Sequence, residues 1–177
     1  STAYSAAVEQ YKLTEMSSFD TLGYKDIKGS FPKDYREMAI SSYLADIIIT
    51  QGIIDQNGKL QFPKTYDDIL KNVKLPIGDT WMRISGIVSK DTSKYESLKK
   101  VSANNIDSET YKLVREFRNI ANISSNKLYV KDGFVNTLKQ KKGAALDNSK
   151  HSLYLHINED DLGLSSLAYP IKSVSHY

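Results

Sequence analysis

The sequence predicts an α+β fold, in which short strands and helices form a small mixed sheet packed with helices. Apolar residues recur at helical spacing in some short windows and alternate at strand spacing in others, and the two kinds of window are interleaved. Turn-forming residues separate most of these windows. Of the 177 residues, 40% are hydrophobic and 25% are charged, which is typical of a globular protein.

Residues 1–30 form an N-terminal lead-in segment. The apolar residues between Ala6 and Tyr11 are spaced for one or two helical turns. Gly29 and Pro32 then mark the approach to a central unit, residues 31–90, around which we expect the chain to be organised.

The central unit begins with a strand that runs directly into a helix. Met38 and Ile40 alternate as in a strand, and Ser41 or Ser42 can cap the helix that follows. Gly52 is predicted to end this helix. Its apolar stripe consists of Leu44, Ala45, Ile47 and Ile48.

A spacer follows, with a hairpin over residues 53–62 that turns at Asn57 and Gly58. Thr65 then precedes a short helix over residues 66–71, and a short strand lies around Leu75. Gly78 and Asp79 are predicted to form a turn before a longer strand. Alternation places Trp81, Arg83, Ser85 and Ile87 on one face of that strand and Met82, Ile84, Gly86 and Val88 on the other.

Residues 91–177 form a second α+β portion, either a separate subdomain or part of the same domain. The polar stretch 90–105 is expected to be a linker or an exposed loop. Asp107 is predicted to cap a helix over residues 108–122, whose stripe is Tyr111, Val114, Phe117, Ile120 and Ala121. Further elements are expected as a strand at 127–130, a helix from Asp132 to Gly143, a strand at 151–157, a helix at 162–167 and a strand at 169–174.

Composition excludes several kinds of function. The net charge of +3 is too weak, and the lysines too scattered, to indicate a nucleic-acid partner. The absence of cysteine excludes disulfides and thiolate chemistry. No apolar run is long enough to span a bilayer, and the chain begins with Ser1, so we expect it to be a piece of a longer protein.

Four clusters are candidate ligand sites. The segment from Asp55 has its glycine at the fourth position and Tyr66 at the twelfth, which does not match a calcium loop. His151 and His156 fall on opposite faces of a strand, so they do not share a metal. Acids at 159–161 and lysines at 139–142 are expected mainly to complement helix dipoles. We therefore expect neither a metal nor a cofactor.

No catalytic motif is present. The sequence contains no nucleophile-elbow serine and no glycine-rich phosphate loop. An envelope hydrolase would need convergent carboxylates, for which Glu37, Asp79 and the acids at 159–161 are the candidates. We expect a non-enzymatic protein, with Trp81, Tyr43 and Tyr66 as candidate partner-binding residues because aromatic side chains are common in interfaces.

The central unit resembles the extracytoplasmic domain of MacB/FtsX-type ABC transporter permeases. The first part of the resembling phrase is carried by Glu37, Ile40, Ser41, Leu44 and Ala45. The second part is carried by Gly78, Asp79, Thr80, Ile84, Gly86, Ile87 and Val88. The resemblance covers residues 29–90, with a longer spacer than is usual, and these residues suit structural rather than catalytic roles.

The resemblance implies a domain outside the cell membrane, joined to transmembrane helices of the same permease and served by a cytoplasmic ABC ATPase. It implies binding of a peptide or envelope protein, in peptide or lipoprotein export, antimicrobial-peptide resistance or control of cell-wall hydrolases. The lysine- and asparagine-rich composition suits a Gram-positive cell surface. The alternative is a secreted or surface-anchored module that binds glycan or protein.

Overall fold

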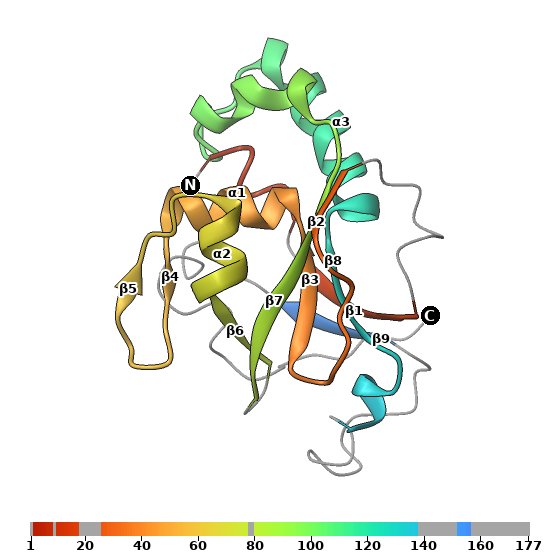
Figure 1. Ribbon diagram of the computed structural model, residues 1–177. Helices are drawn as coiled ribbons and strands as arrows, with labels where there is room; N and C mark the ends of the chain where they lie inside the picture. Colours follow the sequence, from red (N-terminus) through yellow and green to blue (C-terminus); the bar gives the residue numbers. More distant parts are fainter. Residues whose placement is uncertain (1, 9, 18–25, 78–79, 138–151, 157–177) are drawn as a thin grey trace.

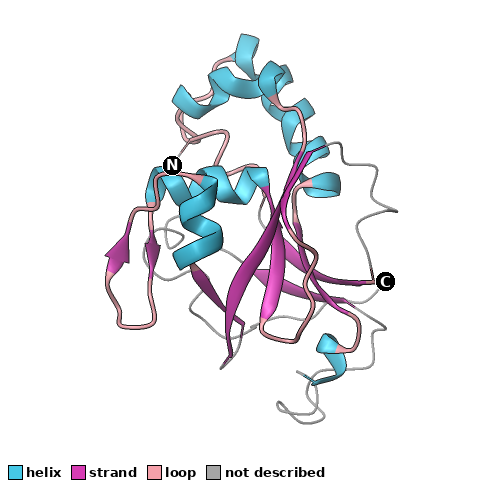
Figure 2. Cartoon of the chain, in the orientation of Figure 1, coloured by secondary structure: helices cyan, strands magenta, loops and turns pink. Residues whose placement is uncertain are grey.

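The computed structural model describes residues 2–8, 10–17, 26–77, 80–137 and 152–156, and confirms the α+β class (Figures 1 and 2). Its mixed sheet has seven strands in this part of the chain. They are β1 (Gln10–Met16), β2 (Asp26–Gly29), β3 (Glu37–Ser41), β6 (Lys74–Ile77), β7 (Thr80–Ser89), β8 (Lys127–Lys131) and β9 (Ser152–His156). The other elements are the hairpin β4 (Ile53–Ile54) and β5 (Leu60–Gln61), the helices α1 (Ser42–Gln51), α2 (Tyr66–Asn72) and α3 (Ser108–Ser124), and the 3-10 helix η1 (Ser93–Lys100).

The sheet joins strands from all three portions of the sequence, in the order β2-β7-β3-β8-β1-β9. The pairs β3–β7 and β1–β8 are parallel, and the other pairs are antiparallel. β6 also pairs with β7, and it lies on the edge opposite β3, because Arg83 is paired with Lys74 on one side and with Glu37 on the other. β7 is therefore bordered along its whole length.

The strand β7 contains an irregularity that changes which face its side chains occupy. Met38 is paired with Ile84, but the next residue, Ala39, is paired with Gly86, so Ser85 is an extra residue on β7. Ile84 and Ile87 consequently belong to the main core, whereas Val88 packs in a second cluster on the other face. The alternation predicted from the sequence is therefore correct up to Ser85 and wrong beyond it.

The helix α1 confirms the predicted start and end. The Ser41 hydroxyl accepts a hydrogen bond from the amide of Leu44, which caps the helix, and the same hydroxyl donates to the carbonyl of Ser125. Gly52 follows the last turn with a φ of 81°, a conformation that favours glycine. Thr65 and Asp107 cap α2 and α3 in the same way, as predicted.

The polar stretch expected as a linker or loop contains η1, which is part of the core. Its Tyr95 and Leu98 are buried, three residues apart, and this spacing matches a 3-10 helix. Figure 1 shows η1 and α3 together above the upper end of the sheet. The expectation was wrong because only two apolar residues in a lysine-rich segment carry the packing.

Two further expectations near the sheet are corrected. Residues 3–6 form a turn and Tyr11 lies in the strand β1, so the one or two helical turns expected from Ala6 to Tyr11 do not form over the described residues of this stretch. After β8, the amides of Gly133 and Val135 donate to the carboxylate of Glu15, a residue of β1, whereas the sequence indicated Asp132 as the cap. A cap supplied from another strand leaves no local sequence signal.

Several predictions fall outside the described residues. These are the turn at Gly78 and Asp79, the lysines at 139–142, the end of the helix expected at Gly143, the acids at 159–161, and the helix and strand expected after them. The strand expected at 151–157 is confirmed as β9 over Ser152–His156.

The first prediction concerns Gly86, whose missing side chain permits close contact between β7 and the residue after β2. A Cβ atom at this position would lie 2.6 Å from the carbonyl oxygen of Ser30. We expect Gly86→Ala to lower the free energy of unfolding by about 2–3 kcal/mol, the upper part of the range for overpacking because the atom that the new side chain meets is backbone, measured by urea denaturation. Gly58→Ala is the control: its Cβ meets nothing within 4 Å, so only the cost of its positive φ, about 1 kcal/mol, is expected. Equal losses in the two variants would contradict the packing argument.

Candidate functional site

The described residues of the resembling phrase, which exclude Gly78 and Asp79, lie together near the centre of the sheet, where β3 runs beside β7. Glu37 begins β3 and Arg83 is its partner on β7, and their side chains form an ion pair. The carboxylate of Glu37, which is 9% exposed, also accepts a hydrogen bond of 2.9 Å from the amide of Lys33. Glu37 therefore fixes the loop before β3, and this pairing leaves it engaged in structure rather than poised as a general base.

The other residues of the phrase have structural surroundings too. Ile40, Leu44 and Ala45 are buried in the main core, and Ser41 caps α1. Next to Gly86, the hydroxyl of Ser85 donates to the carbonyl oxygens of Ser30 and Met38, at 3.0 and 3.3 Å. These contacts join β7 to the chain on both of its edges.

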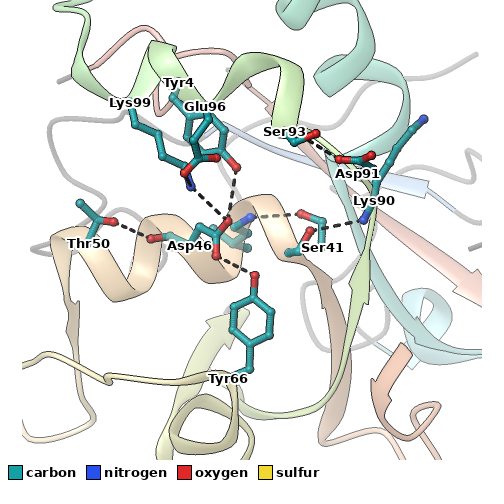
Figure 3. A network of polar contacts seen from close by, with 12 residues as sticks. Tyr4, Ser41, Asp46, Thr50, Tyr66, Lys90, Asp91, Ser93, Glu96 and Lys99 are labelled. Atoms are coloured by element: carbon teal, nitrogen blue, oxygen red, sulfur yellow. Dashed lines mark hydrogen bonds and ion pairs between the residues drawn. The ribbon is translucent and has the colours of Figure 1, made fainter. Parts of the chain in front are cut away.

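A polar network is centred on Asp46 of α1 (Figure 3). Its carboxylate accepts a hydrogen bond of 2.6 Å from the hydroxyl of Tyr66 on α2 and one of 3.5 Å from that of Tyr4. The ammonium of Lys99 on η1 lies 3.7 Å from the same carboxylate and 4.9 Å from the centre of the Tyr4 ring. One carboxylate thereby connects Tyr4, near the N-terminus, with α1, α2 and η1.

Both tyrosines of this network have altered acidity. Burial, followed by the negative charge of Asp46, raises the pKa of Tyr4 well above its ordinary value. Burial and the hydrogen bond to Asp46 likewise raise the pKa of Tyr66. Both phenols therefore stay protonated and act as hydrogen-bond donors throughout the physiological range.

Tyr43 lies beneath this network and fixes the N-terminal segment, which we define as residues 2–8. Its hydroxyl lies 2.8 and 2.9 Å from the carbonyl oxygens of Tyr4 and Ser5, to which it donates, and it accepts from the amide of Val8. The Tyr43 side chain is 1% exposed. The N-terminal segment is therefore part of the core, and Tyr43 is unavailable to an external partner.

A cavity of about 540 Å³ opens at the end of the sheet where β3 and β7 begin. We call it the Trp81 pocket. It is lined by Asp34, Tyr35, Arg36, Glu37, Gln56, Lys74, Thr80, Trp81, Arg83, Phe134 and Thr137. Three of these side chains are basic and two are acidic, and three are aromatic. The pocket thus brings aromatic and cationic side chains together.

The predicted partner-binding residues are separated by the fold. Trp81 lines the pocket, Tyr66 is half-buried in the Asp46 network, and Tyr43 is in the core. Sequence reasoning missed Asp46 and Arg36. Asp46 carries one signal that could have indicated it: it is the lone acid within an otherwise uncharged helix, α1. Arg36 had none, because its role depends on strands distant in sequence.

Neither a metal site nor a membrane-spanning helix is found in the described part of the chain. Among these residues no group of three or more histidines, cysteines or acids is placed to hold a metal ion. Over the same ranges, no helix combines the length and the apolar character needed to cross a membrane. Asp55 accepts hydrogen bonds from the amides of Asn57 and Lys59, within its own hairpin. His151 and the side chain of His156 lie outside the described part of the structure.

Comparison of the chain with family models, with curated proteins and with solved structures gave no match. The function is therefore argued from the sequence phrase and from the geometry described above.

The second prediction follows from the two tyrosines that donate to Asp46. In the unfolded chain the two tyrosines lose their protons above about pH 10, whereas in the folded chain they retain them. Their contribution to the free energy of unfolding is therefore fully present below that pH, and it is lost as the pH rises further. We expect Tyr66→Phe to make this alkaline decline shallower, measured by urea denaturation between pH 8 and about pH 11. Thr50→Ala removes a donor to the Asp46 carbonyl, not to its carboxylate, and should keep the wild-type slope. An unchanged slope in Tyr66→Phe would contradict this account.

Proposed function

We propose that this chain is the extracytoplasmic domain of an ABC transporter permease of the MacB/FtsX type, at the surface of a Gram-positive cell. In this role it is non-catalytic. It binds a peptide or an envelope protein and couples its own conformation to the transmembrane helices of the same permease, and through them to a cytoplasmic ABC ATPase. Plausible tasks are peptide or lipoprotein export, antimicrobial-peptide resistance and control of a cell-wall hydrolase.

The observation that carries the proposal is the common location and structural use of the resembling residues. Gly86 is distant in sequence from Glu37 and Ser41, yet it lies on β7, the strand adjacent to the β3–α1 corner that contains them. Each has a structural partner: Arg83, the amide of Leu44 and the backbone of Ser30, respectively. A phrase made of scaffold residues is what a non-catalytic domain requires, and this supports the family resemblance.

The attachment of the N-terminal segment supports a coupling role. Ala3 and Tyr4 donate backbone hydrogen bonds to Val101 and Leu98, so the segment is joined to η1 as well as to α1. Ala3 is 0% exposed and Tyr4 is 3% exposed. If a membrane helix precedes this segment, a displacement of that helix acts directly on the core of the domain and not on a flexible linker.

A secreted or surface-anchored binding module is the second candidate. The Trp81 pocket supports it, because a cavity lined by Trp81 and Tyr35 is the kind of site that binds a ligand, and such a site needs no attachment to a membrane. The two candidates differ in whether the parent protein remains in the membrane.

The third prediction is that a thiol at position 57 is labelled from outside intact cells, in a full-length parent protein that stays in the membrane fraction. Asn57 is exposed at the hairpin turn, and the chain has no cysteine of its own, so Asn57→Cys gives a single reactive site within it. The measurement is reaction with a membrane-impermeant maleimide before and after lysis.

Ala45→Cys provides the matched control, since Ala45 is 0% exposed and should react only after unfolding. Recovery of the labelled parent in the medium, without membrane retention, would end the permease proposal and leave the secreted binder. Labelling of Asn57→Cys only after lysis would overturn both candidates.

A further inference from the structure

We propose that the Trp81 pocket binds an acidic peptide segment, in which carboxylate side chains alternate with apolar ones. This inference deepens the proposed function, because it rests on the domain being a binding module and names the ligand class of that module. Three features of the described residues support it: the order of charges across the sheet, two cations that form no ion pair with a described acid, and the aromatic walls.

The floor of the pocket is one row of charged residues across three strands. Lys74 on β6 is paired with Arg83 on β7, and Arg83 is paired with Glu37 on β3. Directly paired residues project from the same face of a sheet, and Trp81, two residues from Arg83, shares that face. The face opposite carries the buried Leu75, Met82 and Met38. The row is therefore ammonium, guanidinium and carboxylate, on the face that lies away from the main core.

Two cations of the pocket remain available to a ligand. Glu37 is engaged with Arg83, and the carboxylate of Asp34 accepts a hydrogen bond of 2.7 Å from the backbone amide of Arg36. Within the described ranges, no acid forms an ion pair with the side chain of Arg36 or of Lys74. A guanidinium matches a carboxylate with two parallel hydrogen bonds, and an ammonium supplies a second point charge.

Aromatic surface lies next to these cations. Tyr35, adjacent to Arg36 in sequence, is 41% exposed and its ring centre lies 6.5 Å from that of Phe134. Trp81 is half-buried in the same pocket. Lys131 lies 5.2 Å from the centre of the Tyr35 ring, which adds a cation at the rim. Apolar side chains of a ligand would pack on these rings while its carboxylates reach Arg36 and Lys74.

The same arrangement disfavours a densely charged glycan or phosphate polymer. Such a polymer has no apolar side chains for the aromatic walls, and it places negative charge continuously along the row that contains Glu37. The carboxylates of Glu37 and Asp34 would repel that charge, whereas an alternating peptide can place its apolar residues next to them. Two separate carboxylates therefore match Arg36 and Lys74 better than a continuous line of negative charge does.

The fourth prediction is tested on the 177-residue chain with the capped peptide Ac-Glu-Phe-Glu-Leu-NH2. Trp81 is the single tryptophan of the chain and lines the pocket, so its selectively excited fluorescence reports occupancy. We expect a saturable change with the acidic peptide, weakened by added salt, and little or no change with Ac-Gln-Phe-Gln-Leu-NH2. Arg36→Gln and Lys74→Gln are each expected to weaken binding about fivefold to tenfold.

Arg115→Gln on α3 and Lys100→Gln on η1 are the matched controls, since both residues are exposed and neither lines the pocket. Both variants should bind as the wild type does. Absence of saturable binding, equal binding of the glutamine peptide, or unchanged affinity in Arg36→Gln and Lys74→Gln would each overturn the inference. So would a saturable response to a heparin-derived oligosaccharide in place of the peptide. This titration is independent of membrane location, so its failure is distinguishable from failure of the permease proposal.

Discussion

The parallel pairing of β3 with β7 is the interaction on which the rest of the structure depends. It includes the extra residue Ser85, which changes the faces of β7. On the other edge of β7, Gly86 lets the chain after β2 approach closely, because a side chain there would meet the carbonyl of Ser30. Below Ser85 the pairing sets Glu37 beside Arg83 and so forms the floor of the Trp81 pocket. Above it, β3 passes directly into α1 through the cap at Ser41. Pocket and helix are thus positioned by the same two strands.

The helix α1 extends this constraint to the N-terminal segment. Tyr43 holds the carbonyls of Tyr4 and Ser5 from one side, and Asp46 receives the hydroxyl of Tyr4 from the other. Buried backbone groups that lose such a partner cost about 1–3 kcal/mol each, so the segment cannot detach without a substantial loss. In the proposed coupling role, these bonds would pass a displacement of the N-terminal segment on to α1 and the β3–β7 pair.

Local signals made the elements predictable and left their long-range relations undetermined. The caps at Ser41, Thr65 and Asp107 could be predicted because a cap and its helix are neighbours in sequence. The extra residue at Ser85 could not, because it is defined only by pairing with β3. Trp81, a candidate partner-binding residue, is half-buried and lines the pocket. Tyr43 was misjudged, because a tyrosine of α1 can face the core when its hydroxyl has backbone partners there. The position of Arg36 in the pocket could not be predicted, because it depends on β6 and β7 lying beside β3.

The central claim is that the N-terminal segment and the β3–β7 pair form one cooperative unit, and native-state hydrogen exchange tests it most directly. The amides of Ala3 and Tyr4, which donate to Val101 and Leu98, are compared with the central amides of β7. We predict equal opening free energies and equal dependence on denaturant in the wild type, because both regions then open only on global unfolding. In Tyr43→Phe the two N-terminal amides should exchange ahead of β7. Ready exchange of Ala3 and Tyr4 in the wild type, with β7 still protected, would contradict the claim.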